Sequence, residues 1–209
     1  MRVIVFFITL TGLICSASLA ALAQSQPADP KNLPGVQIGP AAPVAPGFVI
    51  KTPLDKLFEN LKATKSNADA KPIERKIWRL WLESGSDTID LLMTRVMKAM
   101  EKKDYAAALD LLDRIVHLRP GYAEGWNKRA TVHFLLGNHA KSVADIEQVL
   151  IREPRHFGAM SGLGLILQQL GREKKALKLF RMALKIHPHM PGPLKAVERL
   201  KDAVDGSET

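Results

Sequence analysis

The sequence predicts an all-α protein: an array of three helix pairs, preceded by two extra helices and followed by a capping helix. Proline recurs every 34 residues, at Pro120, Pro154 and Pro188, and the apolar residues before each proline fall at helical spacing. Small residues also recur at matching places in the three units. A fixed period of this size is typical of helical repeat arrays, in which neighbouring units bury each other's apolar faces.

Residues 1–23 have the layout of a secretory signal: a positive charge at Arg2, an apolar stretch, and small residues before an Ala-Leu-Ala sequence that ends at Ala23. We expect cleavage after Ala23 and a periplasmic location. The alternative is an uncleaved anchor in the inner membrane with the protein facing the periplasm. Residues 3–23 carry no charge and are long enough to cross a bilayer.

Residues 24–50 are interrupted by closely spaced prolines and glycines. Because proline breaks helices and cannot donate a backbone hydrogen bond, no regular element survives this spacing. We expect an extended, flexible linker.

The composition is that of a globular protein, with 46% hydrophobic and 24% charged residues. The formal net charge is +9, and we interpret the basic residues as spread along every helix among acidic ones, without one dense basic stripe. The single cysteine, Cys15, lies in the leader, so disulfides and cysteine-based metal sites are not expected after cleavage.

Residues 51–86 predict a pair of helices. Thr52 can cap a helix that begins at Pro53, since proline is favoured in the first turn, and a second amphipathic helix follows over about 69–83. We expect this pair to stack on the first repeat unit, with Trp78 and Trp81 closing the seam between them.

Residues 87–190 divide into three units of about 89–122, 123–156 and 157–190. The first helices are predicted at 89–101, 123–136 and 157–170, and the second helices at 104–117, 138–151 and 172–185. Lys103, Gly137 and Gly171 occupy the turn between the two helices of a pair, where glycine permits the left-handed conformation. Residues 191–209 predict a capping helix and a short tail.

Trp126, Ala130, Gly137 and Pro154 resemble the tetratricopeptide repeat, and the third unit matches again at Gly164, Gly171, Ala176, Phe180, Ala183 and Pro188. The first unit departs from the pattern at Val96, where a small residue is usual, and at Lys103. The resemblance implies a right-handed superhelix whose concave groove, lined by the first helices, binds a partner. The family serves as a scaffold for many partners.

From the repeat register we expect twelve side chains to face this groove. They are Asp90, Met93, Met97, Glu101, Glu124, Asn127, Lys128, Thr131, Phe134, Ser161, Leu165 and Gln168. Some members of the family grip a C-terminal carboxylate with a clamp of lysine, asparagine and arginine. Methionines occupy the clamp positions of the first unit here, so this activity is not expected.

No residues predict catalysis, and we expect no cofactor and no metal. The closest histidines, His187 and His189, flank a proline without a cysteine or an evident third ligand. We therefore expect a protein-binding adaptor or scaffold of the bacterial periplasm or envelope. It would hold a protein or peptide partner, with no nucleic acid, and its oligomeric state is open. The alternatives are a module that binds envelope polymers or anionic lipids and, third, an enzyme subunit.

Overall fold

The computed structural model describes residues 52–205, which form α-helices joined by short turns, with no β-strand among them. The helices are α1 (Pro53–Ala63), α2 (Asn67–Leu82), α3 (Asp87–Glu101), α4 (Tyr105–Leu118), α5 (Ala123–Leu135), α6 (His139–Arg152), α7 (Phe157–Gln169), α8 (Glu173–Ile186) and α9 (Pro191–Asp205). The predicted all-α array is confirmed. The expected signal sequence and the proline-rich linker lie outside the described residues.

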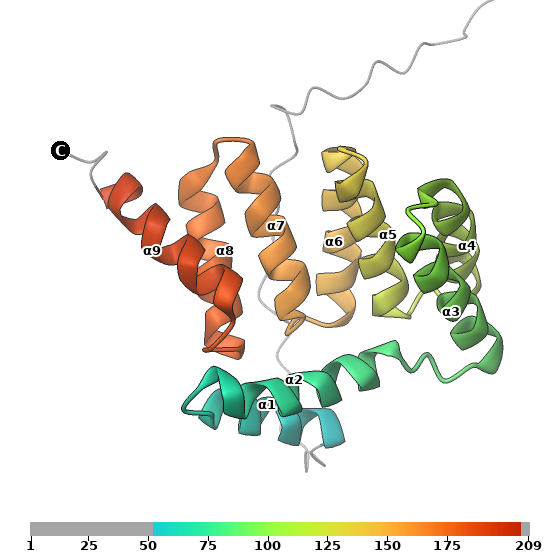
Figure 1. Ribbon diagram of the computed structural model, residues 1–209, viewed down its shortest axis with the longest axis horizontal. Coiled ribbons are helices and arrows are strands. Elements are labelled where there is room, and N and C mark those ends of the chain that lie inside the picture. The colour runs from blue at the N-terminus through green and yellow to red at the C-terminus, as the bar shows by residue number, and fades with distance from the viewer. Residues whose placement is uncertain (1–51, 206–209) are drawn as a thin grey trace, which may run out of the picture.

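Three antiparallel pairs, α3–α4, α5–α6 and α7–α8, stand side by side, and α9 packs on α8 at the end of the row (Figure 1). Each expected helix is present, with bounds that differ by one or two residues at most ends. Within the described part of the chain, no helix combines the length and the apolar content that crossing a membrane requires.

The turn inside each pair has the same left-handed conformation. Its φ is +59° at Lys103, +73° at Gly137 and +70° at Gly171. Glycine adopts this conformation without steric cost, whereas a side chain such as that of Lys103 strains it. The turn of the first unit therefore keeps the backbone conformation of the other two turns, although lysine does not favour it.

Small residues let the two helices of a pair approach closely. The buried hydroxyl of Ser142 on α6 donates a hydrogen bond of 2.8 Å to the carbonyl oxygen of Ala130 on α5. In the third pair, a Cβ added to Gly164 would lie 2.7 Å from the ring of Phe180. The small residues that recur in the sequence are therefore the ones at which the helices of a pair come into contact.

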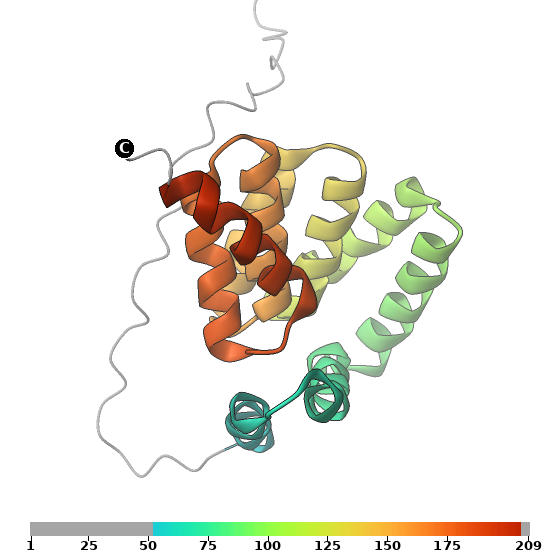
Figure 2. The ribbon, with the colours of Figure 1, turned by 60° about the vertical axis from the view of Figure 1, so that its left-hand side comes forward.

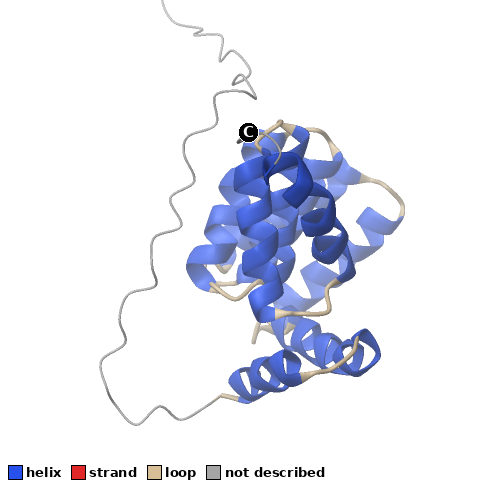
Figure 3. Ribbon diagram, turned by 90° about the vertical axis from the view of Figure 1, so that its left-hand side faces the viewer, coloured by secondary structure: helices blue, strands red, loops and turns tan. Residues whose placement is uncertain are grey.

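The leading pair α1–α2 does not stack on the first unit, so that expectation was wrong. Figures 2 and 3 show α1 and α2 as a separate layer along one edge of the array, beneath the ends of its helices. Helix α1 contacts α8, and α2 contacts α5. The pair thus spans all three units, although the end of α2 is still tied to the first of them because the Tyr122 hydroxyl donates to the carbonyl oxygen of Leu82 at 2.8 Å.

Aromatic rings hold the leading pair in place. Trp81 stacks on His156 with ring centroids 4.1 Å apart, and Trp78 meets Phe157 edge-on at 5.6 Å. His156 and Phe157 lie at the start of α7, so both tryptophans close a seam with the third unit and not with the first. An ion pair of 2.5 Å between Asp55 and Arg155 joins α1 to the loop before α7.

The apolar core forms two clusters. The larger one joins the leading pair to the second and third units and to α9, and the smaller one centres on the first unit. The buried members run from Phe58 to Leu200, so residues 52–205 contain a hydrophobic core of their own.

Candidate functional site

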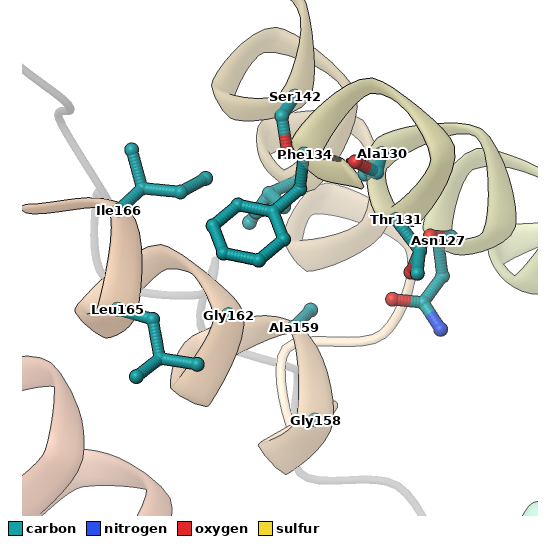
Figure 4. A pocket seen from close by; sticks show the side chains of 11 residues that line it. Asn127, Ala130, Thr131, Phe134, Ser142, Gly158, Ala159, Gly162, Leu165 and Ile166 are labelled. Carbon is teal, nitrogen blue, oxygen red and sulfur yellow. Dashed lines mark hydrogen bonds between the residues drawn. The ribbon is translucent and has the colours of Figure 1, made fainter. Parts of the chain in front are cut away.

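The first helices α5 and α7 lie side by side and, together with α6, line an open hollow of about 140 Å³. Thr131 and Phe134 approach it from α5, and Gly162 and Leu165 from α7 (Figure 4). Gly158 and Gly162 are among the residues that line it, so no side chain enters the hollow from these two positions. An apolar cavity of about 150 Å³ holds a molecule of the size of benzene, so one apolar side chain fits here.

The rim of this hollow carries the side-chain amide of Asn127 and the hydroxyl of Thr131. The amide nitrogen of Asn127 donates to a carboxylate oxygen of Glu124 at 3.0 Å, and in Figure 4 the amide oxygen points toward Ala159. A backbone N–H of a bound segment could donate to that oxygen. The hydroxyl of Thr131 donates its proton to the carbonyl oxygen of Asn127 at 2.9 Å, and its oxygen can accept a further hydrogen bond.

Glu124 is only 1% exposed and lies beneath the site. Its carboxylate lies within hydrogen-bond distance of Nε2 of His156, at 3.2 Å, and forms an ion pair of 2.9 Å with the Lys128 ammonium. The other nitrogen of His156, Nδ1, accepts from the backbone N–H of Ala159 at 3.0 Å, so His156 carries its proton on Nε2 and donates it to Glu124. Burial alone raises the pKa of Glu124, but the hydrogen bond from His156 and the charge of Lys128 outweigh it and hold the pKa below its usual value.

This pairing neutralises the lysine nearest the groove. With its ammonium held by Glu124 and lying 5.9 Å from the ring of Trp78, Lys128 does not face the groove as an unpaired cation. A clamp for a C-terminal carboxylate needs such a cation. Lys128 therefore does not supply this cation.

Four of the twelve residues expected in the groove line the hollow: Asn127, Thr131, Phe134 and Leu165. Met97 and Glu101 are exposed on α3, while Lys128, Ser161 and Gln168 are half-buried. None of these five lines the hollow.

Of the other three residues, Met93 and Glu124 are corrections. Met93, 3% exposed, packs into the core of the first unit, because α3 turns this side chain toward Ile89 and Val96. Glu124 is buried for the reasons given above. Asp90 accepts a hydrogen bond of 3.0 Å from the backbone N–H of Ser84, so it orders the loop before α3.

Trp78 borders the groove, which the sequence register missed. A Cβ added to Gly158 would lie 2.8 Å from the Trp78 ring, so α2 closes the end of the groove where α7 begins. The glycine at position 158 indicates that another group packs closely there. Nothing in the sequence identifies that group as a tryptophan 80 residues earlier.

The two histidines around Pro188 face different elements. His187 is buried beside Phe157, with Nε2 3.4 Å from Glu74, whereas His189 lies 2.8 Å from the carbonyl oxygen of Thr64. Across the described residues, no three histidine, cysteine or acidic side chains gather in a way that could hold a metal ion.

The expectation of evenly spread basic residues was wrong. The three units contain six basic against five acidic residues, five against four, and six against one. The excess gathers on α8, whose exposed residues are Glu173 and five basic residues: Lys174, Lys175, Lys178, Arg181 and Lys185.

The paired helices, the turn residues and the groove of the first helices are features shared with known proteins. A family model for the tetratricopeptide repeat matches residues 94–146 and 128–191. A TPR repeat-containing protein of Rhizobium etli is 44% identical over 159 residues, which cover 76% of this chain and 78% of that protein. The chain belongs to the tetratricopeptide repeat (TPR) family.

More distant TPR proteins share only part of their length with it. A small glutamine-rich TPR-containing protein of Mycosarcoma maydis is 26% identical over 112 residues, covering 54% of this chain and 32% of that protein. The Sgt2 TPR domain from Aspergillus fumigatus superimposes with a TM-score of 0.54 at 22% identity, over 59% of this chain and 83% of that domain.

The first TPR domain of Spaghetti (RPAP3), bound to the HSP90 peptide SRMEEVD, also superimposes with a TM-score of 0.54. It is 18% identical and covers 56% of this chain and 93% of that domain. At these identities the two structures show a shared fold alone.

Proposed function

We propose that this TPR protein is an adaptor that holds an extended segment of a partner protein in the groove between α5 and α7. The observation that supports this most is the apolar hollow beneath Phe134 and Leu165, which no side chain of the described residues fills. The Leu165 side chain is 43% exposed at its edge. Exposed apolar side chains around a cavity favour the binding of an apolar anchor residue.

We further propose that the anchor lies within the partner segment and not at its C-terminus. The groove combines an apolar hollow with the Asn127 acceptor, and the ammonium of Lys128 is paired with Glu124. A backbone N–H and an aliphatic or aromatic side chain satisfy this combination, whereas a terminal carboxylate finds no unpaired cation at the groove. We assign the chain no catalytic role.

Display of a peptide library with amidated C-termini tests the groove. Enriched peptides should share a leucine, isoleucine, methionine or phenylalanine, and Leu165→Asp should abolish their binding because it places a charge over the hollow. The matched control is Ile151→Asp on α6, at a side chain that is 71% exposed and does not line the hollow. It should bind normally.

Two results would contradict the proposal: equal loss in the two variants, or binding of the peptide SRMEEVD that depends on its free carboxylate. Circular dichroism should confirm that both variants remain folded, since each changes an exposed side chain.

A location in the bacterial periplasm or envelope is part of the same proposal. It is supported by the leader pattern of residues 1–23 and by the lack of any cysteine after Cys15. Fractionation of cells that express a C-terminally tagged chain, followed by sequencing of the mature N-terminus, tests it. A mature start at Gln24 in the soluble periplasmic fraction is expected. Retention of the leader in the inner membrane would favour the anchored alternative, and a cytoplasmic chain would exclude both.

A further inference from the structure

The second helices of the three units differ sharply in charge, although they share one fold. Three exposed or half-exposed positions of the repeat are equivalent in α4, α6 and α8 by the 34-residue period. They hold Asp110, Asp113 and His117 in α4, Ala144, Glu147 and Ile151 in α6, and Lys178, Arg181 and Lys185 in α8. The fold therefore does not require a basic residue at any of these positions.

The basic side chains of α8 form a single face. Lys175, Lys178, Arg181 and Lys185 recur at intervals of three and four residues, which places them on one side of a helix over a length of about 15 Å. No acidic residue of the described chain pairs with these four. Figure 2 shows α8 along the outer edge of the array.

The residue types on this face argue against two classes of partner, proteins and nucleic acids. A protein interface is centred on apolar, aromatic and arginine side chains and is depleted in lysine, whereas the exposed residues of α8 comprise four lysines, one arginine and Glu173. Single-stranded nucleic acid is bound through aromatic stacking, and sequence readout of a duplex needs side chains that reach base edges. Exposed aromatic and amide side chains are both absent from α8.

A charged bilayer surface requires none of these features. Anionic headgroups attract basic side chains through charge alone, by about 1 kcal/mol for each lysine or arginine near the surface. Lysine serves as well as arginine here, because no bidentate geometry is needed. A straight outer helix can also bring several cations to a flat surface at once.

We propose that the exposed face of α8 is a docking surface for a bilayer that contains anionic lipids. The face is separate from the groove between α5 and α7, so the two could be occupied at the same time. Docking orients the protein with α8 toward the headgroups. The inference depends on the charge of α8 and not on the leader.

Sedimentation with lipid vesicles tests the proposal, using the chain without residues 1–23 because the folded body has its own core. Vesicles of phosphatidylcholine alone are compared with vesicles of phosphatidylcholine and phosphatidylglycerol in equal parts. The protein should bind only the second kind, and added salt should weaken binding through screening. The triple variant Lys178→Ala, Arg181→Gln and Lys185→Ala should bind about a hundredfold more weakly.

The control removes three positive charges elsewhere. Arg95, Lys98 and Lys102 are exposed at the first unit, where acidic neighbours accompany them. The triple variant Arg95→Gln, Lys98→Ala and Lys102→Ala should keep its affinity within about threefold, since a cation distant from the bilayer is screened. Leu165→Asp should not change vesicle binding, which separates this proposal from that of the groove.

Several results would overturn the proposal. Equal losses in the two triple variants would indicate a response to net charge alone. Binding to neutral vesicles, or no binding to anionic ones, would exclude the surface. Tighter binding to polyglutamate or to duplex DNA than to anionic vesicles would replace the bilayer with an acidic protein or a nucleic acid. Both triple variants change exposed residues, so circular dichroism should show unaltered folding.

Discussion

At the scale of single residues, Lys103 carries a strain that the other two units avoid. Its φ of +59° is left-handed, and the equivalent residues are Gly137 and Gly171. We predict that Lys103→Gly raises the free energy of unfolding by about 0.5–1 kcal/mol, because relief of a strain of about 1–2 kcal/mol exceeds the entropy that glycine adds to the unfolded chain. Urea denaturation measures the change.

The converse substitution is the control. Gly137 has the same backbone conformation, and a Cβ added there would meet no atom within 4 Å. Gly137→Ala therefore tests backbone strain without a steric clash and should cost about 1 kcal/mol. If Lys103→Gly lowered the urea midpoint, the positive φ would not be a source of strain.

At the scale of helices, Gly162 and Gly164 look alike in the sequence, but alanine should have opposite effects at the two positions. A Cβ on Gly162 would touch only Ile146, at 3.8 Å, so Gly162→Ala should stabilise α7 by about 0.5–1 kcal/mol through its helix propensity. A Cβ on Gly164 would lie 2.7 Å from Phe180, and overpacking of this kind costs about 1–3 kcal/mol.

Urea denaturation of the two alanine variants should therefore place their midpoints on opposite sides of the wild-type midpoint. Gly162 also lines the hollow between α5 and α7, so Gly162→Ala should weaken peptide binding while it stabilises the fold. Equal midpoints would contradict the close packing of α7 on α8. Unchanged peptide binding would contradict the place of the groove.

At the scale of the whole molecule, the sequence predicted what is periodic and local. The 34-residue period located the helix pairs and their turns, and Thr52 capped α1 as expected through a capping box with Asp55. The place of the leading pair was not predictable in this way. It depends on contacts such as that of Trp81 with His156, which lie 75 residues apart and follow no period.

The groove shows the same limit. The register identified the faces of α5 and α7 that line the hollow, because the repeat fixes how these helices pack. Glu124 was expected on the same side of α5, but its carboxylate is buried and bonds to His156 and Lys128. A charged residue is expected at the surface by type, and only its partners explain why it is buried.

Acidic solution should loosen the leading pair before it unfolds the helices. Bonding to Arg155 and Thr52 lowers the pKa of Asp55 from 3.8 to about 2, and the pKa of Glu124 is also held below its ordinary 4.5. Both groups bind protons more weakly in the folded protein than in the unfolded chain. Their contribution to stability is therefore complete above about pH 4.5 and is lost as the pH falls through the lower, folded pKa values.

We predict that the urea midpoint, followed by tryptophan fluorescence, falls as the pH drops from about 4.5 toward 2. Trp78 and Trp81 report on the seam, because protonation of Glu124 removes the negative charge from the acceptor of the His156 hydrogen bond, and Trp81 stacks on His156. Glu124→Gln should be less stable than the wild type at neutral pH and should show a shallower decline in acid. Glu101→Gln, at an exposed carboxylate on α3, should follow the wild-type curve. A decline that is as steep in Glu124→Gln as in the wild type would show that this carboxylate does not link the leading pair to the array.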